Sequence, residues 1–331
     1  MDFGYGHPLR GDRFDRFMTL ARSTGFLENI EIAEPVSASE EDLLLTHTQS
    51  YLNMVEAFAM ESIPLTPDTP LVPELPKAAR MLVGGTLLAG KKALDHGLCM
   101  GFGGTHHASR DRGGGFCLYN DVAVLSEWLK HKGYKRILNL DTDAHCGDGT
   151  LDTFYKDPEV LYVSIHQHPA TLYPGRGFLE DVGAGEGEGY SINLPLVPKS
   201  GIEDYRLVVD NIVLPIIKEY KPDIVIRNGG SDPCRWDHLA MLDLDLDGLT
   251  YLGSIGRDIA QENSAPLVDL SLSGYGGGIA EGWLALWRGT TGLDIDIPSP
   301  GISKPVGKEP KKDNIDMLEQ AKRHFGYYWK L

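Results

Sequence analysis

Three side chains of types that commonly bind metal ions stand at alternate positions of one short segment, namely Asp141, Asp143 and His145. The apolar run 137–140 before them is typical of a buried parallel strand, so these side chains lie where a strand is expected to end. Side chains alternate along an extended chain, so all three would share one face if the strand continued that far. Ligands of open α/β sheets bind outside the carboxyl ends of the strands. The spacing therefore predicts a metal site, without identifying the metal.

A catalytic zinc site combines three protein ligands with one open position. Asp143 and His145 can supply two of these ligands, and Asp232, in the glycine-rich segment 228–232, is the best candidate for the third. An isolated Asp-x-Asp pair is more often a helix cap or a polar turn. The histidine at the same alternation and the second acidic loop favour the metal site instead.

Two adjacent histidines, His106 and His107, follow another apolar run, 98–102, and a pair of glycines. Either imidazole can take a proton from water and return it near neutral pH. Each ring needs a partner for its other nitrogen, and Asp141 and Asp148 are the spare acids. A lone histidine is usually structural, whereas two at a strand end favour acid–base catalysis. Asp141 is therefore a candidate both for the metal and for a histidine.

Tyr275 is flanked by glycines in the segment 273–278. Taken alone, it would be interpreted as an ordinary half-buried aromatic residue. The glycines favour a different role, because they let the loop bring the phenol close to a substrate carbonyl as a hydrogen-bond donor.

Two further segments resemble ligand-binding loops but lack an essential residue. The glycines 113–115 are not followed by the Lys-Ser or Lys-Thr of a phosphate-binding loop. The alternating leucines and aspartates of 242–248 lack the later glutamate of a calcium loop. We assign neither segment a ligand, and we expect the second to be a half-exposed edge that leads into a helix.

Short apolar runs alternate with segments long enough for crossover helices, such as 121–131 and 202–220. This pattern favours a mostly parallel sheet with helices on both faces. The segments after the strands are polar and rich in glycine, as a single active site on one rim requires. The predicted strands are 98–102, 137–140, 160–165, 190–194, 223–227 and 266–272.

Two proline-rich segments are expected at the surface. Residues 63–76 contain five prolines and predict a structured loop, from which Asp68 would be available to a rim. Residues 298–331 predict a tail packed on the body, with a helix over 315–325. We expect residues 1–331 to form a single domain, because no linker divides the chain.

Composition excludes several classes of protein. The chain has 331 residues, 42% of them hydrophobic, and its 47 acidic and 31 basic residues give a net charge of −16. This charge argues against nucleic acid as the main partner and suits a cationic or neutral substrate. The four cysteines form no Cys-x-x-Cys pattern, so neither a disulfide framework nor a thiolate zinc cluster is expected. No apolar run approaches the ~20 residues of a membrane span, and we expect a cytoplasmic protein without a membrane partner.

Taken together, these motifs resemble the histone deacetylase family, which includes acetylpolyamine amidohydrolases and acetoin-utilisation proteins. The resemblance runs in the right order from about Gly6 to Tyr275. It implies an arginase-like three-layer αβα fold around a central, mostly parallel eight-stranded sheet. It also implies zinc-dependent amide hydrolysis with one Zn²⁺ per chain. The motifs are 103–107, 115–121, 141–145, 229–232 and 273–275.

The resemblance also implies roles for individual residues. The zinc ligands would be Asp143, His145 and Asp232, and Tyr275 would stabilise the transition state. The tandem catalytic histidines would be His106 and His107, paired with Asp141 and Asp148 respectively.

Further positions match the substrate channel and a second cation. Gly115 and Phe116 resemble one wall of an acyl-lysine channel, and Tyr173 resembles the other, where phenylalanine is more usual. Asp68 matches a rim aspartate that holds the substrate backbone, although its spacing is offset by about one residue. A structural monovalent-cation site, usually filled by potassium, would involve Asp141, Asp143, His145, Ser164 and Ile165.

Three departures from the family concern the substrate rather than the chemistry. Cys146 stands where many relatives have a second histidine, and Leu272-Ser273 stands where they often have glutamate or glycine. Asp237 lies in a tryptophan-containing variant of the loop after Asp232. The sequence does not choose among acetyl-lysine peptides or proteins, acetylpolyamines and other small acylated amines. It also leaves a homo-oligomer open.

Two other functions remain as alternatives. A ureohydrolase with two manganese ions is disfavoured, because His145 and Cys146 occupy positions where such a site needs acids. A non-catalytic zinc-containing protein that binds acylated ligands is disfavoured, because every catalytic position is filled.

Overall fold

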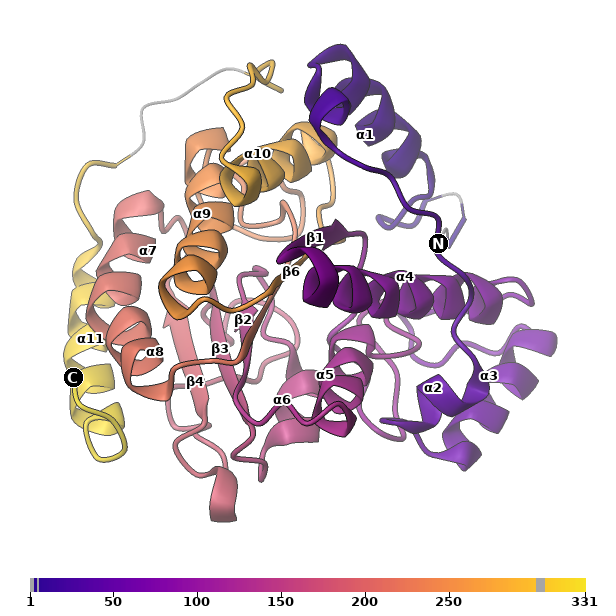
Figure 1. The fold of residues 1–331 in the computed structure, drawn as a ribbon, viewed down its shortest axis with the longest axis horizontal. Helices are drawn as coiled ribbons and strands as arrows, with labels where there is room; N and C mark the ends of the chain where they lie inside the picture. Colours follow the sequence, from indigo (N-terminus) through magenta and orange to yellow (C-terminus); the bar gives the residue numbers. More distant parts are fainter. Residues whose placement is uncertain (1–2, 5, 302–306) are drawn as a thin grey trace.

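The computed structural model describes residues 3–4, 6–301 and 307–331. Within these ranges six strands form one sheet (Figure 1) in the order β1-β6-β5-β2-β3-β4, and every neighbouring pair is parallel. All six lie where the apolar runs predicted them. They are β1 (Leu98–Gly101), β2 (Ile137–Asp141), β3 (Val160–Gln167), β4 (Ser191–Leu196), β5 (Ile224–Asn228) and β6 (Leu267–Leu270).

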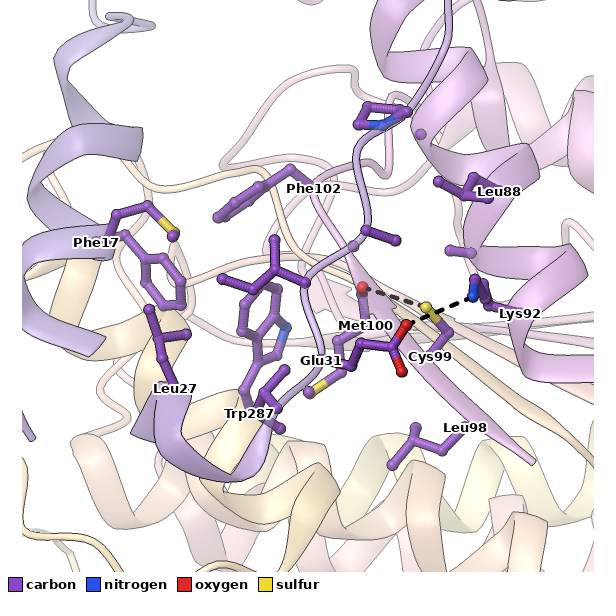
Figure 2. Close-up of a pocket in the computed structure, with 18 of the residues that line it drawn as sticks. Phe17, Leu27, Glu31, Leu88, Lys92, Leu98, Cys99, Met100, Phe102 and Trp287 are labelled. Atoms are coloured by element: carbon purple, nitrogen blue, oxygen red, sulfur yellow. Dashed lines mark hydrogen bonds and ion pairs between the residues drawn. The ribbon is translucent and has the colours of Figure 1, made fainter. Parts of the chain in front are cut away.

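The prediction of eight strands was wrong for the part of the chain that the structure describes. β1 is an edge strand. The segment 31–36 lies beyond it but has no regular secondary structure and makes no backbone hydrogen bond with it. A cavity separates the two backbones (Figure 2), so they are not in pairing contact.

Helices cover both faces of the sheet and give the three layers of Figure 1, each helix layer packing an apolar core against it. No helix in the described ranges is long and apolar enough to cross a membrane. One face carries α2 (Glu40–Leu44), α3 (Gln49–Met60), α4 (Leu75–His96), α5 (Asp121–His131) and α6 (Asp148–Phe154). The other carries α1 (Asp12–Ser23), α7 (Ile202–Val208), α8 (Leu214–Tyr220), α9 (Leu246–Asn263), α10 (Ile279–Thr291) and α11 (Lys312–Phe325).

The helix predictions agree with the structure in most places. α5 has the predicted bounds, and the side chain of Asn120 caps it by accepting from the backbone N of Ala123 at 2.8 Å. The predicted helix 202–220 is α7 and α8 joined by a π-helical turn, Val209–Val213. The segment 242–248 leads into α9 as expected, with Asp245 as its N-cap.

The proline-rich loop is shorter than predicted, because α4 begins at Leu75. Pro76 therefore lies in the first helical turn, where proline costs no hydrogen bond.

The C-terminal helix α11 docks on the body through its buried Asn314. The Oδ1 atom of this side chain accepts from the backbone N of Val197 at 3.0 Å, and its Nδ2 atom donates to Ser200 Oγ at 2.7 Å. Part of the predicted tail 298–331, residues 302–306, lies outside the described residues.

A fully buried ion pair joins β5 to β6 and contacts the segment 141–143 at the end of β2. Arg227 on β5 donates to the carboxylate of Asp269 on β6, and both side chains are inaccessible to solvent. Arg227 Nη1 also donates to Thr142 Oγ1 at 3.0 Å. Thr142 lies between Asp141 and Asp143, so the pair supports the segment that carries these acids.

Replacing Arg227 with methionine is expected to lower the free energy of unfolding by about 3–5 kcal/mol, because it leaves the carboxylate of Asp269 buried and uncompensated. Urea titration would measure the loss. The double variant Arg227→Met/Asp269→Leu removes both charges and should regain much of it. Equal instability of the single and double variants would contradict the electrostatic explanation.

Candidate active site

The predicted site residues follow four neighbouring strands and lie at the carboxyl ends of these strands. β1, β6, β5 and β2 are consecutive and parallel, so the segments that follow them leave the sheet at the same edge. These segments carry the histidine pair, the tyrosine, the second acidic loop and the first acidic loop respectively. The sheet order thus brings together motifs that are far apart in the sequence.

Asp143, His145 and Asp232 form a buried cluster whose ligand atoms all lie within 4.8 Å of one another. Nδ1 of His145 is 3.1 Å from Oδ1 of Asp143 and 3.0 Å from Oδ2 of Asp232. In the described ranges, no other three His, Cys, Asp or Glu side chains are grouped in this way. One imidazole and two carboxylates are a donor set that suits zinc and leaves a fourth position for substrate or water.

The charges of the cluster are strongly coupled. Burial alone would lower the pKa of His145, but hydrogen bonds to Asp143 and Asp232 outweigh it and raise the pKa to about 10. Burial and the neighbouring carboxylate of Asp143 raise the pKa of Asp232 to about 8. Without a metal, a proton on His145 Nδ1 is therefore held between the carboxylate of Asp143 and the carboxyl group of Asp232, among the atoms that would bind a cation.

Zinc binding at pH 7 is expected to release at least one proton, because a ligating His145 nitrogen must lose its hydrogen. The deprotonated cluster becomes more populated as pH rises, so the apparent zinc affinity should increase from pH 6 to pH 8. Isothermal titration calorimetry in two buffers of different ionisation enthalpy would count the protons. An affinity that is independent of pH would contradict the assignment of His145.

Two histidine–carboxylate pairs lie beside the cluster. Nδ1 of His106 is 2.9 Å from Oδ2 of Asp141, and Nδ1 of His107 is 2.7 Å from Oδ1 of Asp148. An ionised carboxylate only accepts hydrogen bonds, so each Nδ1 carries the hydrogen and each Nε2 remains to exchange a proton. The structure thus places Asp141 on a histidine rather than in the ligand cluster.

The two histidines differ in charge because their surroundings differ. At His106, the carboxylates of Asp141 and Asp143 outweigh the effect of burial and raise the pKa to about 9. At His107, burial and then the positive charge of His106 lower the pKa below its usual 6.5. At neutral pH a neutral His107 therefore stands next to a protonated His106.

Tyr275 is held close to the cluster by its glycine-rich loop. Its ring centroid is 6.3 Å from that of His145 and 5.6 Å from that of Phe116. The carboxylate of Asp237 accepts from the backbone N of Tyr275 at 2.7 Å, and Gly276 has a φ of 144°, a conformation that favours glycine. Burial raises the pKa of the phenol well above its usual value, so it remains a neutral donor.

The predicted channel residues line the approach to this site. Phe116, His107 and Tyr275 border a cavity of about 20 Å³, and Tyr173 lies further out, 45% exposed. The rings of Tyr173 and His107 are 5.0 Å apart. Gly115 allows this contact, because a Cβ there would lie 2.6 Å from Cδ2 of His107 and 2.8 Å from Cε1 of Tyr173.

Asp68 is linked through Thr69 to Phe116, the predicted wall of the channel. Its carboxylate accepts from Thr69 Oγ1 at 2.9 Å, and Thr69 Oγ1 accepts from the backbone N of Phe116 at 3.0 Å. Burial, followed by the charges of Asp148 and Asp68, raises the pKa of Tyr173. The loop 63–74 therefore places one acid near the mouth of the channel.

The residues expected to hold a monovalent cation lie on adjacent strands. Asp141 at the end of β2 pairs in register with Ser164 on β3, which is followed by Ile165. Asp143 and His145 follow Asp141 directly. Their role in binding a cation remains a prediction.

Two residues that the sequence did not identify as site residues support the acids directly. Ser273 Oγ donates to Oδ1 of Asp232 at 2.7 Å, and the hydroxyl of Tyr162 donates to Oδ2 of Asp141 at 3.2 Å. The only signal for Ser273 was its departure from the family pattern. Cys146, another departure, is buried with its Sγ atom 3.8 Å from the hydroxyl of Tyr162, and it is not part of the ligand cluster.

A third supporting residue, Asp121, holds the turn before the histidines. Its buried carboxylate accepts from the backbone N of Gly104 at 3.0 Å and from that of Thr105 at 2.7 Å. No local pattern identified this role, because Asp121 also begins helix α5.

Comparison with known proteins agrees with this arrangement. Residues 7–289 match the histone deacetylase domain. The chain is 33% identical to a probable deacetylase of Archaeoglobus fulgidus, over 98% of this chain and 94% of that protein. It is 32% identical to the acetoin utilization protein AcuC of Bacillus subtilis, over 91% and 82% of the two chains. Among solved structures, an HDAC homologue from Aquifex aeolicus is similar with a TM-score of 0.85 and 27% identity, over 97% of this chain and 96% of that one.

The chain belongs to the histone deacetylase family. The predicted resemblance and the three-layer α/β fold are thus confirmed. Membership supports a hydrolase with deacetylase activity.

Proposed function

We propose that the protein is a zinc-dependent amide hydrolase that removes acetyl groups from acetylated amines. The proposal depends on one observation: the Asp143–His145–Asp232 cluster lies beside two histidine–carboxylate pairs and a buried phenol. When bound, zinc would polarise the acetyl carbonyl and lower the pKa of water towards ~7.

His107 is the base that takes the proton from the attacking water. Its Nδ1 atom is engaged by Asp148, and its lowered pKa keeps Nε2 unprotonated at neutral pH. Once protonated, His107 can return this proton to the leaving amine. His106, held by Asp141, keeps a positive charge next to it, which favours that return.

Tyr275 donates a hydrogen bond to the oxygen of the acetyl carbonyl as negative charge develops on it. The loop around Asp237 fixes the phenol in advance, so little reorganisation is needed during the reaction. The high pKa of the phenol keeps its hydrogen in place throughout.

The channel supports a short acyl group on a cationic amine. The cavity beside His107 and Tyr275 has a volume of about 20 Å³, which suits acetyl better than a long chain. The net charge of −16 and the acid Asp68 at the rim attract a positive substrate. Both acetyl-lysine peptides and acetylpolyamines meet these conditions. We also propose potassium at the predicted cation site between β2 and β3.

A released-acetate assay tests the proposal. The zinc-loaded protein is given N-acetylputrescine, acetylspermidine and an acetyl-lysine peptide in parallel, and a chelator-treated sample serves as the control. We expect acetate from at least one substrate, loss of activity after chelation, and recovery with one equivalent of zinc. Tight binding without acetate release would instead support a binding protein, and two manganese ions per chain would support a ureohydrolase.

A further inference from the structure

The two oxygens of the Asp232 carboxylate have different neighbours. Oδ2 lies 3.0 Å from Nδ1 of His145, among the candidate ligand atoms of the cluster. Oδ1 accepts a hydrogen bond from Ser273 Oγ at 2.7 Å. Asp232 is inaccessible to solvent and Ser273 is buried, so bulk water does not compete for this contact. One oxygen therefore faces the cluster while the other is held by a hydroxyl group that follows a different strand.

The backbone that carries Ser273 is fixed by hydrogen bonds of its own. Its carbonyl oxygen accepts from Trp283 Nε1 at 2.8 Å and from the backbone N of Ser231 at 3.0 Å. The buried Arg13 donates from Nη1 to the carbonyl oxygens of the residues before and after Ser273, at 3.0 Å and 3.2 Å. These contacts hold the hydroxyl at its place beside Asp232, so little ordering is needed for it to donate.

The close approach of Ser273 to the loop of Asp232 depends on Gly230. A Cβ atom at this position would lie 2.3 Å from Ser273 Oγ and 2.2 Å from its carbonyl oxygen. Both separations are shorter than packed atoms allow, so a larger residue would force the hydroxyl or the loop to move. The absence of a side chain at position 230 thus provides the space in which the hydroxyl meets the carboxylate.

The contact matters because a carboxylate can bind a metal ion through one oxygen or through both. A catalytic zinc site needs three protein ligands and one open position, and a second bond from the same carboxylate would crowd that position. A hydrogen bond to Oδ1 orients the carboxylate and occupies the oxygen that would form the second bond. The hydroxyl of Ser273 therefore acts on the number of bonds that Asp232 can make.

We infer that Ser273 is a positioning residue that restricts Asp232 to one metal bond, through Oδ2, and thereby favours zinc over ions that prefer more oxygen ligands. Zinc accepts four ligands in a tetrahedral arrangement, whereas manganese prefers six, mostly oxygen atoms. The inference rests on the proposed function, because it requires that Asp143, His145 and Asp232 bind the metal. It adds a source of metal selectivity that lies outside these three residues.

A direct contact of Ser273 with the acetyl group explains the geometry less well. Ser273 lines the active-site cavity together with Tyr275. A hydroxyl group has one hydrogen, however, and Ser273 donates it to Asp232. The remaining lone pairs can only accept, and the acetyl carbonyl is itself an acceptor. The hydroxyl therefore serves the ligand rather than the acyl group.

Metal titrations of the metal-free full chain and of Ser273→Ala test the inference. Zinc affinity should fall by about 10–100-fold in the variant, the usual effect of losing a partner that orients a ligand. Manganese affinity should fall less, so the preference for zinc over manganese narrows. A spectroscopic measurement accompanies the titrations: with Co²⁺ in place of zinc, the visible absorption of the variant should be weaker than that of the wild type. The reason is that Co²⁺ absorbs less strongly when it has more than four ligands.

The matched control is Ser271→Ala, which removes a buried hydroxyl from the same segment. Ser271 Oγ accepts from Arg227 Nη2 at 3.0 Å, and Ser271 is not in the ligand cluster. This variant can lose stability, but it should keep the zinc affinity and the Co²⁺ spectrum of the wild type. Wild-type zinc affinity in Ser273→Ala, or an equal loss for both metals with an unchanged Co²⁺ spectrum, would overturn the inference. Zinc binding that survives in Asp232→Ala would overturn the proposed cluster itself, and the inference with it.

Discussion

Replacing His107 with alanine is expected to lower kcat by about 10²–10⁴-fold, the usual contribution of a positioned general acid–base. The variant retains the zinc ligands and Tyr275 but has no group that takes the proton from water. Steady-state kinetics with the substrate identified by acetate release would measure the loss. Zinc content should remain at one per chain, because His107 is not in the ligand cluster.

The pH profile separates this role from a structural one. Neutral His107 is the active form and its pKa is lowered, so kcat/KM of the wild type should fall only as pH drops below 6.5. This acid limb should disappear in His107→Ala. His131→Ala, at an exposed position on α5, is the matched control and should retain full activity. An unchanged acid limb in His107→Ala would assign the proton transfer to another group.

Replacing Tyr275 with phenylalanine is expected to lower kcat by about 10²–10³-fold, with KM changed little. The hydrogen bond to the developing oxyanion is stronger in the transition state than in the ground state, so its loss affects turnover rather than binding. Phenylalanine retains the ring that packs 5.6 Å from Phe116, so the loop should keep its conformation. The measurement is kcat and KM on the same substrate at saturating zinc.

A matched control for this variant is Tyr327→Phe, at a position that is 86% exposed and remote from the channel. It should behave as the wild type. Full turnover by Tyr275→Phe would exclude the phenol as the oxyanion donor. A rise in KM without a loss of kcat would instead make Tyr275 a substrate-binding residue.

The strands and most helices could be predicted from the sequence because each depends on a local pattern. Apolar runs of strand length and a capped helix such as 121–131 are encoded by neighbouring residues. The sheet edge was not predictable in this way. Pairing of β1 with a further strand depends on whether another backbone lies within hydrogen-bonding distance of it. Residues 31–36 form no backbone hydrogen bond with β1.

The same distinction between local and long-range information applies to the candidate site. Asp143 and His145 were evident from their alternation after β2. The alternation left the role of Asp141 open, and the family resemblance predicted its pairing with His106, from which it lies 2.9 Å away in the structure. The contact of Ser273 with Asp232 joins residues 41 positions apart. No local signal specifies such a contact.

The sequence by itself determined the residue types of the site, their positions after predicted strands and the family to which the chain belongs. Only the tertiary structure decided which further residues support the ligands, and that no strand in the described residues pairs with the outer edge of β1. The physical reason is that periodicity and motifs report the surroundings of a residue along the chain. The order β1-β6-β5-β2, by contrast, sets which distant segments meet at the rim.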